Sequence, residues 1–232
     1  MNELALFAGA GGGLLASNLL GWKTVCAVEL DWHSRCILTQ RQNDGLLHPF
    51  PIWDDVRTFN GRAWRGIVDV VSGGFPCQAF STAASGRNNA DDLWPEMRRV
   101  VADVAPRYVF AENVSKDAIN NAASDLEEMG YEVRCTQLSA KDMGADHIRE
   151  RFWLLAHANM HSKLRIPINA KVGFMPGVRS GVWETYTDEP RMDDGVAYRM
   201  DRLKATGNGQ VPIVAAAAFL VLSKHFVQIE KK

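Results

Sequence analysis

Short apolar runs alternate with segments of helical periodicity along most of this chain, and no other feature limits the possible folds as strongly. The first run, Leu4–Phe7, is followed by a glycine cluster and then by a helical pattern that ends near Gly21. The second run, Thr24–Val28, leads to Asp31, a residue type that begins helices well. Further strands are expected at residues 68–71, 108–111, 131–135 and 152–156, and further helices at residues 31–42, 91–104, 115–129 and 210–225. This order predicts an α/β fold with a mostly parallel, twisted sheet and helices on both faces.

One interruption of the alternation predicts how the chain is organised. Between residues 159 and 190 the pattern gives way to glycines, prolines, basic residues and scattered aromatic residues. A chain of 232 residues has the size of one domain that carries an insertion. We therefore expect residues 1–158 to form the main domain, residues 159–190 an inserted surface segment, and residues 191–232 the segment that completes the main domain.

Composition excludes several classes of protein. Hydrophobic residues make up 47% and charged residues 23% of the chain, which is typical of a globular protein and excludes a disordered or collagen-like one. No apolar run approaches the roughly 18 residues that span a bilayer, and Glu3 stands where a signal peptide would carry a basic residue. The four cysteines are irregularly spaced without a C-x-x-C pair, so neither a disulfide framework nor a zinc site is indicated. We expect a cytosolic protein in which any functional cysteine acts through thiol chemistry.

The charge is balanced over the whole chain but uneven along it. Lys and Arg number 26 and Asp and Glu number 27, which gives a net charge of -1. Between residues 147 and 180, however, six Lys or Arg residues stand against one acid. Because nucleic-acid binding depends on a local basic surface and not on the total charge, this stretch is the candidate for contact with phosphate groups.

The glycine-rich segment FAGAGGG (residues 7–13) directly follows the first expected strand. Glycines at this point let the chain turn tightly and let a ligand approach the backbone. Glu29 ends the second strand about 20 residues after Gly9, where a carboxylate can accept hydrogen bonds from ribose hydroxyls. The alternative is a tight turn with a solvated Glu29, and binding of a phosphate is less favoured because no Lys-Ser or Lys-Thr pair follows the glycines.

Three further segments carry side chains capable of chemistry. Cys77 lies just beyond an expected buried strand and follows Pro76, at the sheet edge where α/β proteins bind ligands. An isolated cysteine is more often a small buried hydrophobe. Glu112 ends the next strand and would reach the same edge, while Arg149 and Arg151 would project from one face of a later strand. Taken singly, Glu112 could equally well be an exposed acid at a strand end, and a charged strand start explains the two arginines better than a functional role does.

In their order along the chain, these segments resemble the motifs of the DNA cytosine-5 methyltransferase family. The matching strings are FAGAGG (7–12), GFPCQ (74–78), ENV (112–114), HIRER (147–151) and GNGQVP (207–212). The resemblance covers about residues 3–156 and 191–222, and five motifs in the same order do not agree by chance. It implies a Rossmann-like class I methyltransferase fold, with residues 159–190 as a much reduced target-recognition insertion.

The resemblance also implies a reaction. Cys77 would attack carbon 6 of a cytosine rotated out of the duplex, so that carbon 5 can take a methyl group. Glu112 would protonate the ring nitrogen and hold the exocyclic amine. Arg149 would bind the base carbonyl, and Arg151 would hold Glu112 or the nearby backbone. Loss of the proton at carbon 5 would then expel Cys77.

The methyl donor that the family implies is S-adenosylmethionine, and no metal is expected. The residues that match the cofactor site are Phe7, Ala10, Gly11, Gly12, Glu29, Leu30, Asp55, Val56, Pro76, Leu93, Asn208 and Gln210. Glu29 would bind the ribose, Leu30 and Val56 would enclose the adenine, and Asp55 would accept from the adenine amine. Asn208 and Gln210 would lie near the methionine end.

Double-stranded DNA is the partner that the resemblance implies, with a cognate restriction endonuclease as a further candidate. The residues expected to contact DNA are Gln78, Ser81, Arg87, Lys163, Arg165, Lys171 and Arg179, and the alternative for the last four is a solvated basic loop. We expect a monomer in the cytoplasm of a bacterial or phage-infected cell. Because an insertion of this length covers little DNA, we predict a short or degenerate target sequence read between Lys163 and Trp183.

The chain departs from the family pattern at two further places. His147 replaces the usual Gln before the paired arginines, and the loop from Ser81 to Asp92 is short. Two other functions stay open beside DNA methylation. One is a tRNA cytosine-5 methylase, less favoured because of the residues that follow Cys77. The other is a catalytically silent DNA-binding or regulatory protein, against which the presence of Cys77, Glu112 and Arg149 argues.

Overall fold

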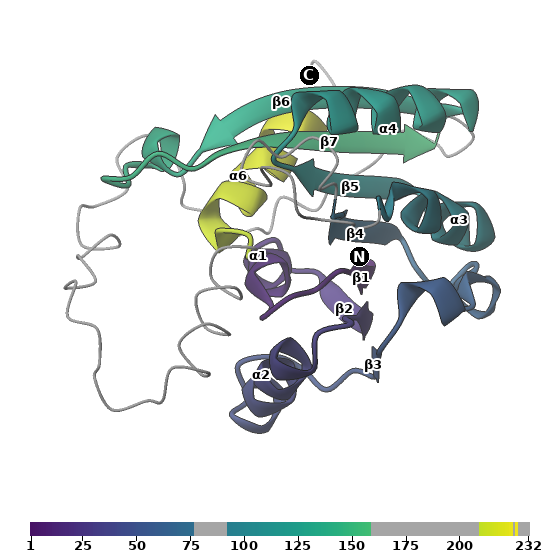
Figure 1. The fold of residues 1–232 in the computed structure, drawn as a ribbon, viewed down its shortest axis with the longest axis vertical. Helices are drawn as coiled ribbons and strands as arrows, with labels where there is room; N and C mark the ends of the chain where they lie inside the picture. Colours follow the sequence, from purple (N-terminus) through teal and green to yellow (C-terminus); the bar gives the residue numbers. More distant parts are fainter. Residues whose placement is uncertain (77–91, 159–208, 225, 227–232) are drawn as a thin grey trace, which may run out of the picture.

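A seven-stranded sheet with the order β3-β2-β1-β4-β5-β7-β6 organises the protein (Figure 1). The computed structural model describes residues 1–76, 92–158, 209–224 and 226. The strands are β1 (Asn2–Leu6), β2 (Lys23–Val28), β3 (Ile52–Trp53), β4 (Val70–Gly74), β5 (Tyr108–Asn113), β6 (Tyr131–Ser139) and β7 (Glu150–Ala158). All pairs from β3 to β5 are parallel, and β7 runs antiparallel to both β5 and β6. The prediction of a mostly parallel sheet is confirmed.

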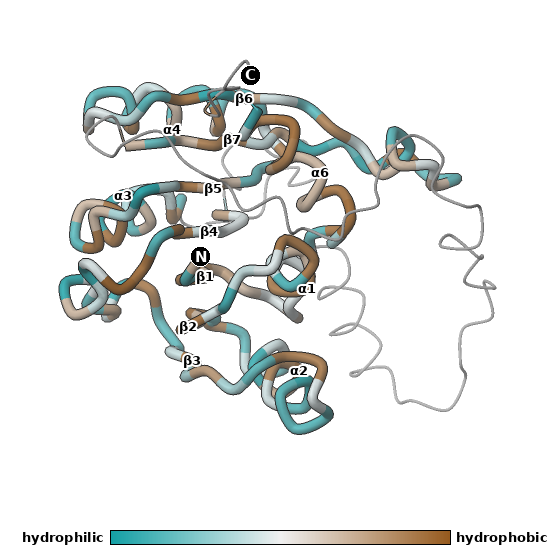
Figure 2. Tube along the Cα trace, turned by 180° about the vertical axis from the view of Figure 1, so that it is seen from behind, coloured by the Kyte–Doolittle hydropathy of each residue, from teal (hydrophilic) through white to brown (hydrophobic). Residues whose placement is uncertain are grey.

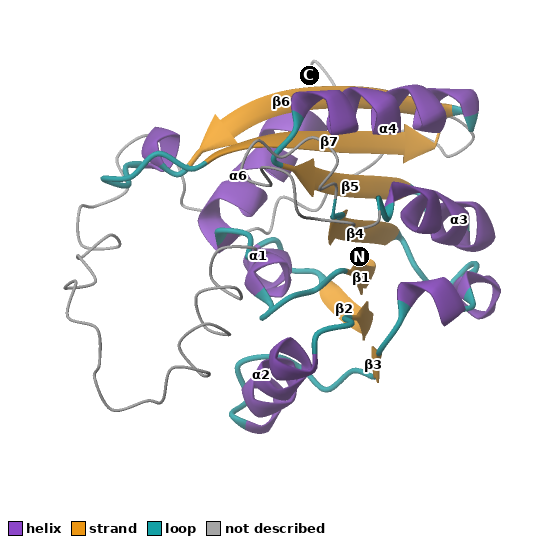
Figure 3. Ribbon diagram, in the orientation of Figure 1, coloured by secondary structure: helices purple, strands orange, loops and turns teal. Residues whose placement is uncertain are grey.

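Helices cover both faces of this sheet, as predicted (Figure 3). The helices are α1 (Gly12–Leu19), α2 (Trp32–Asn43), α3 (Trp94–Val104), α4 (Lys116–Glu128) and α6 (Pro212–Ser223), with short 3-10 turns at Val56–Thr58, Gly61–Trp64 and Lys141–Met143. Asp31 caps α2 by accepting from the Ser34 amide, and Ser115 caps α4 by accepting from the Ala118 amide. These side-chain caps explain why both helices begin where the sequence predicted.

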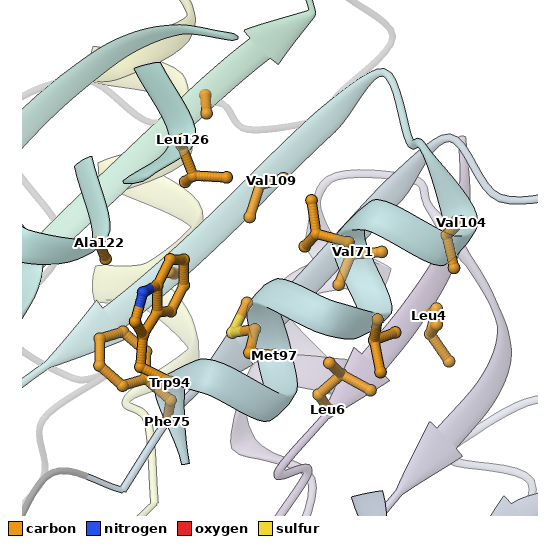
Figure 4. Close-up of a cluster of buried hydrophobic side chains, with 14 of the residues drawn as sticks. Leu4, Leu6, Val71, Phe75, Trp94, Met97, Val104, Val109, Ala122 and Leu126 are labelled. Atoms are coloured by element: carbon orange, nitrogen blue, oxygen red, sulfur yellow. The ribbon is translucent and has the colours of Figure 1, made fainter. Parts of the chain in front are cut away.

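The strands divide their side chains between two cores because successive residues point to opposite faces. Leu4 and Leu6 of β1 pack in the cluster under α3 and α4, where Phe75 lies against Trp94 with ring centroids 5.1 Å apart (Figure 4). Ala5 faces the other way, in a cluster with residues of α1 and α2. A third cluster joins α6 to the same side of the sheet. Burial on both faces accounts for the continuous apolar runs in the sequence.

Helix α6 is the most uniformly apolar helix of the fold, and it is brown along much of its length in Figure 2. It packs against α1 and against β6 and β7, so the end of the described chain returns to the sheet as expected. The helix starts at Pro212, two residues later than predicted, because proline fits the first turn of a helix. Gln210 and Val211 therefore lie in the connection that leads into it.

Other elements also differ from the predictions. The strand expected at residues 68–71 is β4 at Val70–Gly74, because pairing with β1 and β5 holds Ser72 and the two glycines in the sheet despite their weak strand preference. The helix expected from residue 91 begins at Trp94, next to Pro95. The short edge strand β3 was not predicted.

In the described part of the chain, no helix is both long and apolar enough to cross a membrane. The expected insertion, residues 159–190, lies outside the described residues.

Candidate active site

A recess opens where β1 and β4 end, beside the glycine loop formed by residues 7–13. It is lined by Ala5, Leu6, Phe7, Ala8, Gly9, Gly13, Leu14, Ser72, Gly73, Gly74, Gly209 and Gln210. Phe7 has a φ of 53° and Gly9 the same value, so the chain turns away sharply as soon as β1 ends. A positive φ is unusual for a residue with a side chain and often marks a functional turn. Five of the twelve lining residues are glycines, so backbone atoms form a good part of the wall of the recess.

Glu29 at the end of β2 fixes the glycine loop. Its Oε2 accepts from the Gly9 amide at 2.6 Å and its Oε1 accepts from the Asp31 amide at 2.8 Å. Each carboxylate oxygen can accept more than one hydrogen bond, so Glu29 can still accept from ligand hydroxyls. A backbone-lined recess with a carboxylate at its side fits a nucleoside cofactor such as S-adenosylmethionine.

Three other predicted cofactor residues lie at the ends of β2 and β3, outside the lining of this recess. Leu30 is 55% exposed, whereas Val56 is 4% exposed and packs in the core under α3. Asp55 forms an ion pair with Arg57 at 2.9 Å, and hydrogen bonds from Arg57 lower the pKa of its carboxyl group. The roles of these residues toward adenine stay predictions.

Glu112 is the centre of a charged cluster at the end of β5. It is paired in register with Gly74 of the adjacent parallel strand β4, so the segment that leads to Cys77 starts at the same sheet edge. The residue is 7% exposed, and Arg151 contacts its Oε1 through Nε at 2.9 Å. Burial raises the pKa of Glu112, while the positive charges of Arg151 and Arg149 oppose this rise. A carboxyl group in this setting can hold a proton at a higher pH than an exposed one.

Arg149 belongs to the same cluster and lies just before β7, which begins at Glu150. Its Nη2 donates to the Gly209 carbonyl at 2.6 Å. Burial and the charge of Arg151 lower the pKa of Arg149, and Glu112 opposes this. The two arginines thus converge on one site, although β7 includes only Arg151. The Gln210 side chain donates a hydrogen bond to Glu112 and completes the charged cluster, which consists of Glu112, Arg149, Arg151 and Gln210.

Two contributions to the site were missed by the sequence reasoning. Asn113 received no role, yet its Nδ2 donates to the Phe75 carbonyl at 2.8 Å and its Oδ1 accepts from the Ser115 amide at 2.9 Å. Asn113 therefore ties the end of β5 to the segment before Cys77, and its place beside Glu112 in the ENV string was the available signal. The contact of Gln210 with Glu112 joins distant parts of the chain and has no local sequence signal.

The two described ends of the loop that carries Cys77 lie against each other. The Leu93 amide donates to the Pro76 carbonyl at 3.2 Å, directly before α3. Ala10, Gly11 and Gly12 continue the glycine loop into α1. The predicted residues Cys77, Gln78, Ser81, Arg87, Lys163, Arg165, Lys171, Arg179 and Asn208 lie outside the described residues. Within the described ranges, no group of three His, Cys, Asp or Glu side chains could hold a metal ion.

Comparisons with known proteins show which family the chain resembles over most of its length. The C-5 cytosine-specific DNA methylase family matches residues 1–188. The type II methyltransferase M1.HphI of Haemophilus parahaemolyticus is 33% identical over 65% of this chain and 44% of its own length, and M.NgoMIV of Neisseria gonorrhoeae is 31% identical over 69% of this chain and 53% of its own length. The chain thus spans about half the length of the curated relatives it matches.

Solved structures extend the likeness to three dimensions. A candidate DNA modification methyltransferase encoded within an Escherichia coli prophage has a TM-score of 0.55 and 27% identity, over 68% of this chain and 47% of that chain. The S. pombe Dnmt2 methyltransferase also has a TM-score of 0.55, at 22% identity over 71% of this chain and 53% of that chain, and shares the fold. The predicted Rossmann-like fold is confirmed. With its ordered motifs and a family match over most of its length, the chain belongs to the C-5 cytosine-specific DNA methylase family.

Proposed function

We propose that this protein transfers a methyl group from S-adenosylmethionine to carbon 5 of cytosine in double-stranded DNA, in the cytoplasm of a bacterial or phage-infected cell. The observation that carries the proposal is the position of Glu112. Its carboxyl group is buried at the end of β5, where it pairs with Arg151. The neighbouring strand β4 leads to Cys77. Membership of the methylase family supports the same reaction class.

The residues divide the work of the reaction between them. The Cys77 thiolate forms a bond to carbon 6 of the flipped cytosine, and the ring electrons move toward carbon 5. Glu112, whose pKa is raised by burial, gives a proton to the ring nitrogen and accepts from the exocyclic amine. Arg149 binds the base carbonyl. Once carbon 5 carries the methyl group, a base removes the proton from carbon 5, Glu112 takes back the proton from the ring nitrogen, and the carbon–sulfur bond breaks to restore the ring and the thiolate.

The cofactor supplies an electrophilic methyl group on a sulfonium when it is bound. Phe7 and Gln210 line the recess that would hold it, and Glu29 lies beside the glycine loop to accept from its ribose. The loop excludes bulky side chains next to the donor because much of the lining is glycine. We also expect the protein to be a monomer and to have a cognate restriction endonuclease.

Transfer of tritium from labelled S-adenosylmethionine separates this function from its alternatives. We expect label in double-stranded DNA that contains cytosine, and none in the same DNA made with 5-methylcytosine. Label in tRNA instead of DNA would identify a tRNA methylase. Cofactor binding without transfer to any nucleic acid would identify a silent binding protein.

Cys77→Ala tests the nucleophile, with Cys36→Ala, a change at an exposed cysteine of α2, as the matched control. We expect the first variant to lose all transfer while it keeps its fold and cofactor affinity, and the second to keep transfer. Duplex DNA with 5-fluorocytosine at the target should form a lasting adduct, because fluorine cannot leave carbon 5 as a proton does. Mapping of that adduct to a residue other than Cys77 would overturn the assignment.

Bisulfite sequencing of DNA methylated in vitro tests the predicted target. A short or degenerate sequence context is expected because the insertion at residues 159–190 is small. A long, fixed recognition sequence would contradict this prediction.

A further inference from the structure

Gln210 lies where the two parts of the site meet. On one side, its side-chain amide donates to the Glu112 carboxyl group, and Gly209 just before it accepts from Arg149 at 2.6 Å. On the other side, Gln210 lines the recess beside the glycine loop. One residue of the connection before α6 therefore contacts both the charged cluster and the predicted cofactor pocket.

Glycines from two separate motifs make room for this residue. A Cβ atom at Gly12 would collide with the Gln210 carbonyl group, and one at Gly13 would come within 2.7 Å of Gln210 Oε1. A Cβ atom at Gly74, at the end of β4, would come within 2.6 Å of Glu112 Oε2 and 3.3 Å of Gln210 Nε2. The amide is thus confined with its oxygen toward the loop and its nitrogen toward the carboxyl group. A carboxylate only accepts hydrogen bonds, so it requires this orientation of the amide.

We propose that Gln210 is a positioning residue for Glu112: confined between the glycine loop and the end of β4, its amide holds the carboxyl group in the orientation that receives the flipped base. The inference rests on the proposed function, since Glu112 is the group that would contact the base. Gln210 acts through Glu112 and is assigned no chemical step of its own. Because Gln210 also contacts the glycine loop, a change in the conformation of the loop should alter the position of Glu112.

The charged groups that face Glu112 set the expected sign of the effect. Among the described residues these are Arg151 and Arg149, and both favour the ionised carboxylate. The hydrogen bond from Gln210 favours it as well. Removal of the amide should therefore raise the pKa of Glu112 beyond the rise that burial already causes. A second carboxylate in place of the amide should raise it further, because like charges disfavour ionisation.

Gln210→Met and Gln210→Glu test the proposal, since both keep a side chain of similar length. Carbon-13 NMR of the labelled glutamate carboxyl groups, with the Glu112 signal assigned through Glu112→Gln, reads the titration in the protein without cofactor or DNA. We expect the pKa of Glu112 to rise by about one unit in Gln210→Met and by more in Gln210→Glu. Gln137→Met, the same change at an exposed position of the edge strand β6, should leave the titration unchanged.

Kinetics provide the second readout. In Gln210→Met we expect kcat for methyl transfer to fall roughly tenfold while KM for S-adenosylmethionine changes less than about threefold, because positioning acts on the reacting complex. An unshifted Glu112 titration in both folded variants would overturn the proposal. So would a rise in the cofactor KM with an unchanged kcat. If the wild-type protein transfers no methyl group to DNA, the proposed function fails, and the NMR titration still decides whether Gln210 acts on Glu112.

Discussion

The glycine loop and the charged cluster lie at the same edge of the sheet but present different groups to a ligand. The loop offers mainly backbone, shaped by residues with positive φ and held by the Glu29 carboxylate. The cluster offers side chains, with a buried acid between two guanidinium groups. The glycine loop should therefore be sensitive to substitutions that add atoms, and the charged cluster to substitutions that remove a charge.

Strand direction explains how the charged cluster is assembled. The last residues of β5, which is parallel to β4, place Glu112 at the edge of the sheet. Because β7 runs antiparallel to β5, the first residues of β7 place the arginines at the same edge. Glu112 stands opposite Trp153, and Arg151 precedes Trp153 on the same strand face. A parallel β7 would place its first residues at the far edge of the sheet. The reversal of one strand thus completes an acid–arginine pair.

The largest effect is expected from removing the acid while keeping its shape. Glu112→Gln cannot supply a proton to the ring nitrogen, so we expect methyl transfer to fall by about 100-fold or more. Cofactor affinity should change little, because Glu112 does not line the recess. Tritium transfer and a cofactor-binding titration measure both. Glu132→Gln, at a half-exposed acid of β6, is the matched control and should keep full activity.

Arg151→Met breaks the charged cluster at its ion pair. Loss of the partner of a buried acid costs about 3 kcal/mol or more, so the variant should unfold at lower urea concentration. The pKa of Glu112 is already raised above 4.5, so the folded state keeps a proton that the unfolded state loses above that pH. Stability from this group therefore falls as pH rises, and without Arg151 the fall extends to higher pH.

The pH series supplies the check on Arg151→Met. Its loss of stability should be larger at pH 8 than at pH 5.5. Arg134→Met breaks an exposed pair with Glu132 and should cost less than about 1 kcal/mol at either pH. Equal losses in the two variants would show that Glu112 does not depend on its guanidinium partner.

Sequence patterns predicted the parallel half of the fold well because its strands are buried on both faces. Val70 and Val71 have no exposed surface and point to opposite cores, so the run reads as continuously apolar. The edge strand β3 holds only Ile52 and Trp53 directly after Pro51, too short a run to read as a strand. The direction of β7 was not predicted, although the connection from residue 140 to 149 holds only a 3-10 turn and is too short for a parallel crossover.

Local sequence indicates at which edge of the sheet the candidate site residues lie, but not how they are arranged. Glu29 follows β2 directly and Glu112 is the second-last residue of β5, so their edge of the sheet could be predicted from local sequence. The meeting of Gln210 with Glu112 depends on where α6 packs, and packing between distant segments leaves no local pattern. Burial of Val56 likewise follows from the position of α3 over the 3-10 turn that contains it.

Adding one methyl group to the glycine loop tests the part of the site built from backbone. In most helices Gly→Ala stabilises by up to about 1 kcal/mol. Gly13→Ala should instead bring little or none of this stabilisation, because its Cβ would lie within 2.7 Å of Gln210 Oε1 and the amide would have to turn aside to make room. The double variant Gly13→Ala with Gln210→Ala removes the obstacle and should recover the stabilisation. Additive effects in this cycle would contradict the contact.

The smallest effect is expected at Glu3, a second buried acid that has hydroxyl partners in place of arginines. It is 1% exposed, and Ser17, Thr24 and Ser72 donate to it at 2.7, 2.7 and 2.6 Å. Burial raises the pKa of Glu3, so the folded state holds its proton above pH 4.5 and the protein loses stability as pH rises toward the folded pKa.

Glu3→Gln removes this titration while its amide oxygen keeps an acceptor for the hydroxyls. We expect stability within about 1 kcal/mol of the wild type near pH 5 and a flatter decline toward pH 8. Urea unfolding across that range measures the slope, with Glu128→Gln at the exposed end of α4 as the control. Methyl transfer should be unchanged, because Glu3 does not line the recess and the variant keeps an acceptor for Ser72, which does. Parallel pH profiles for Glu3→Gln and the wild type would mean that the hydroxyls keep Glu3 ionised, and that hydroxyl donors can replace the guanidinium groups of the charged cluster.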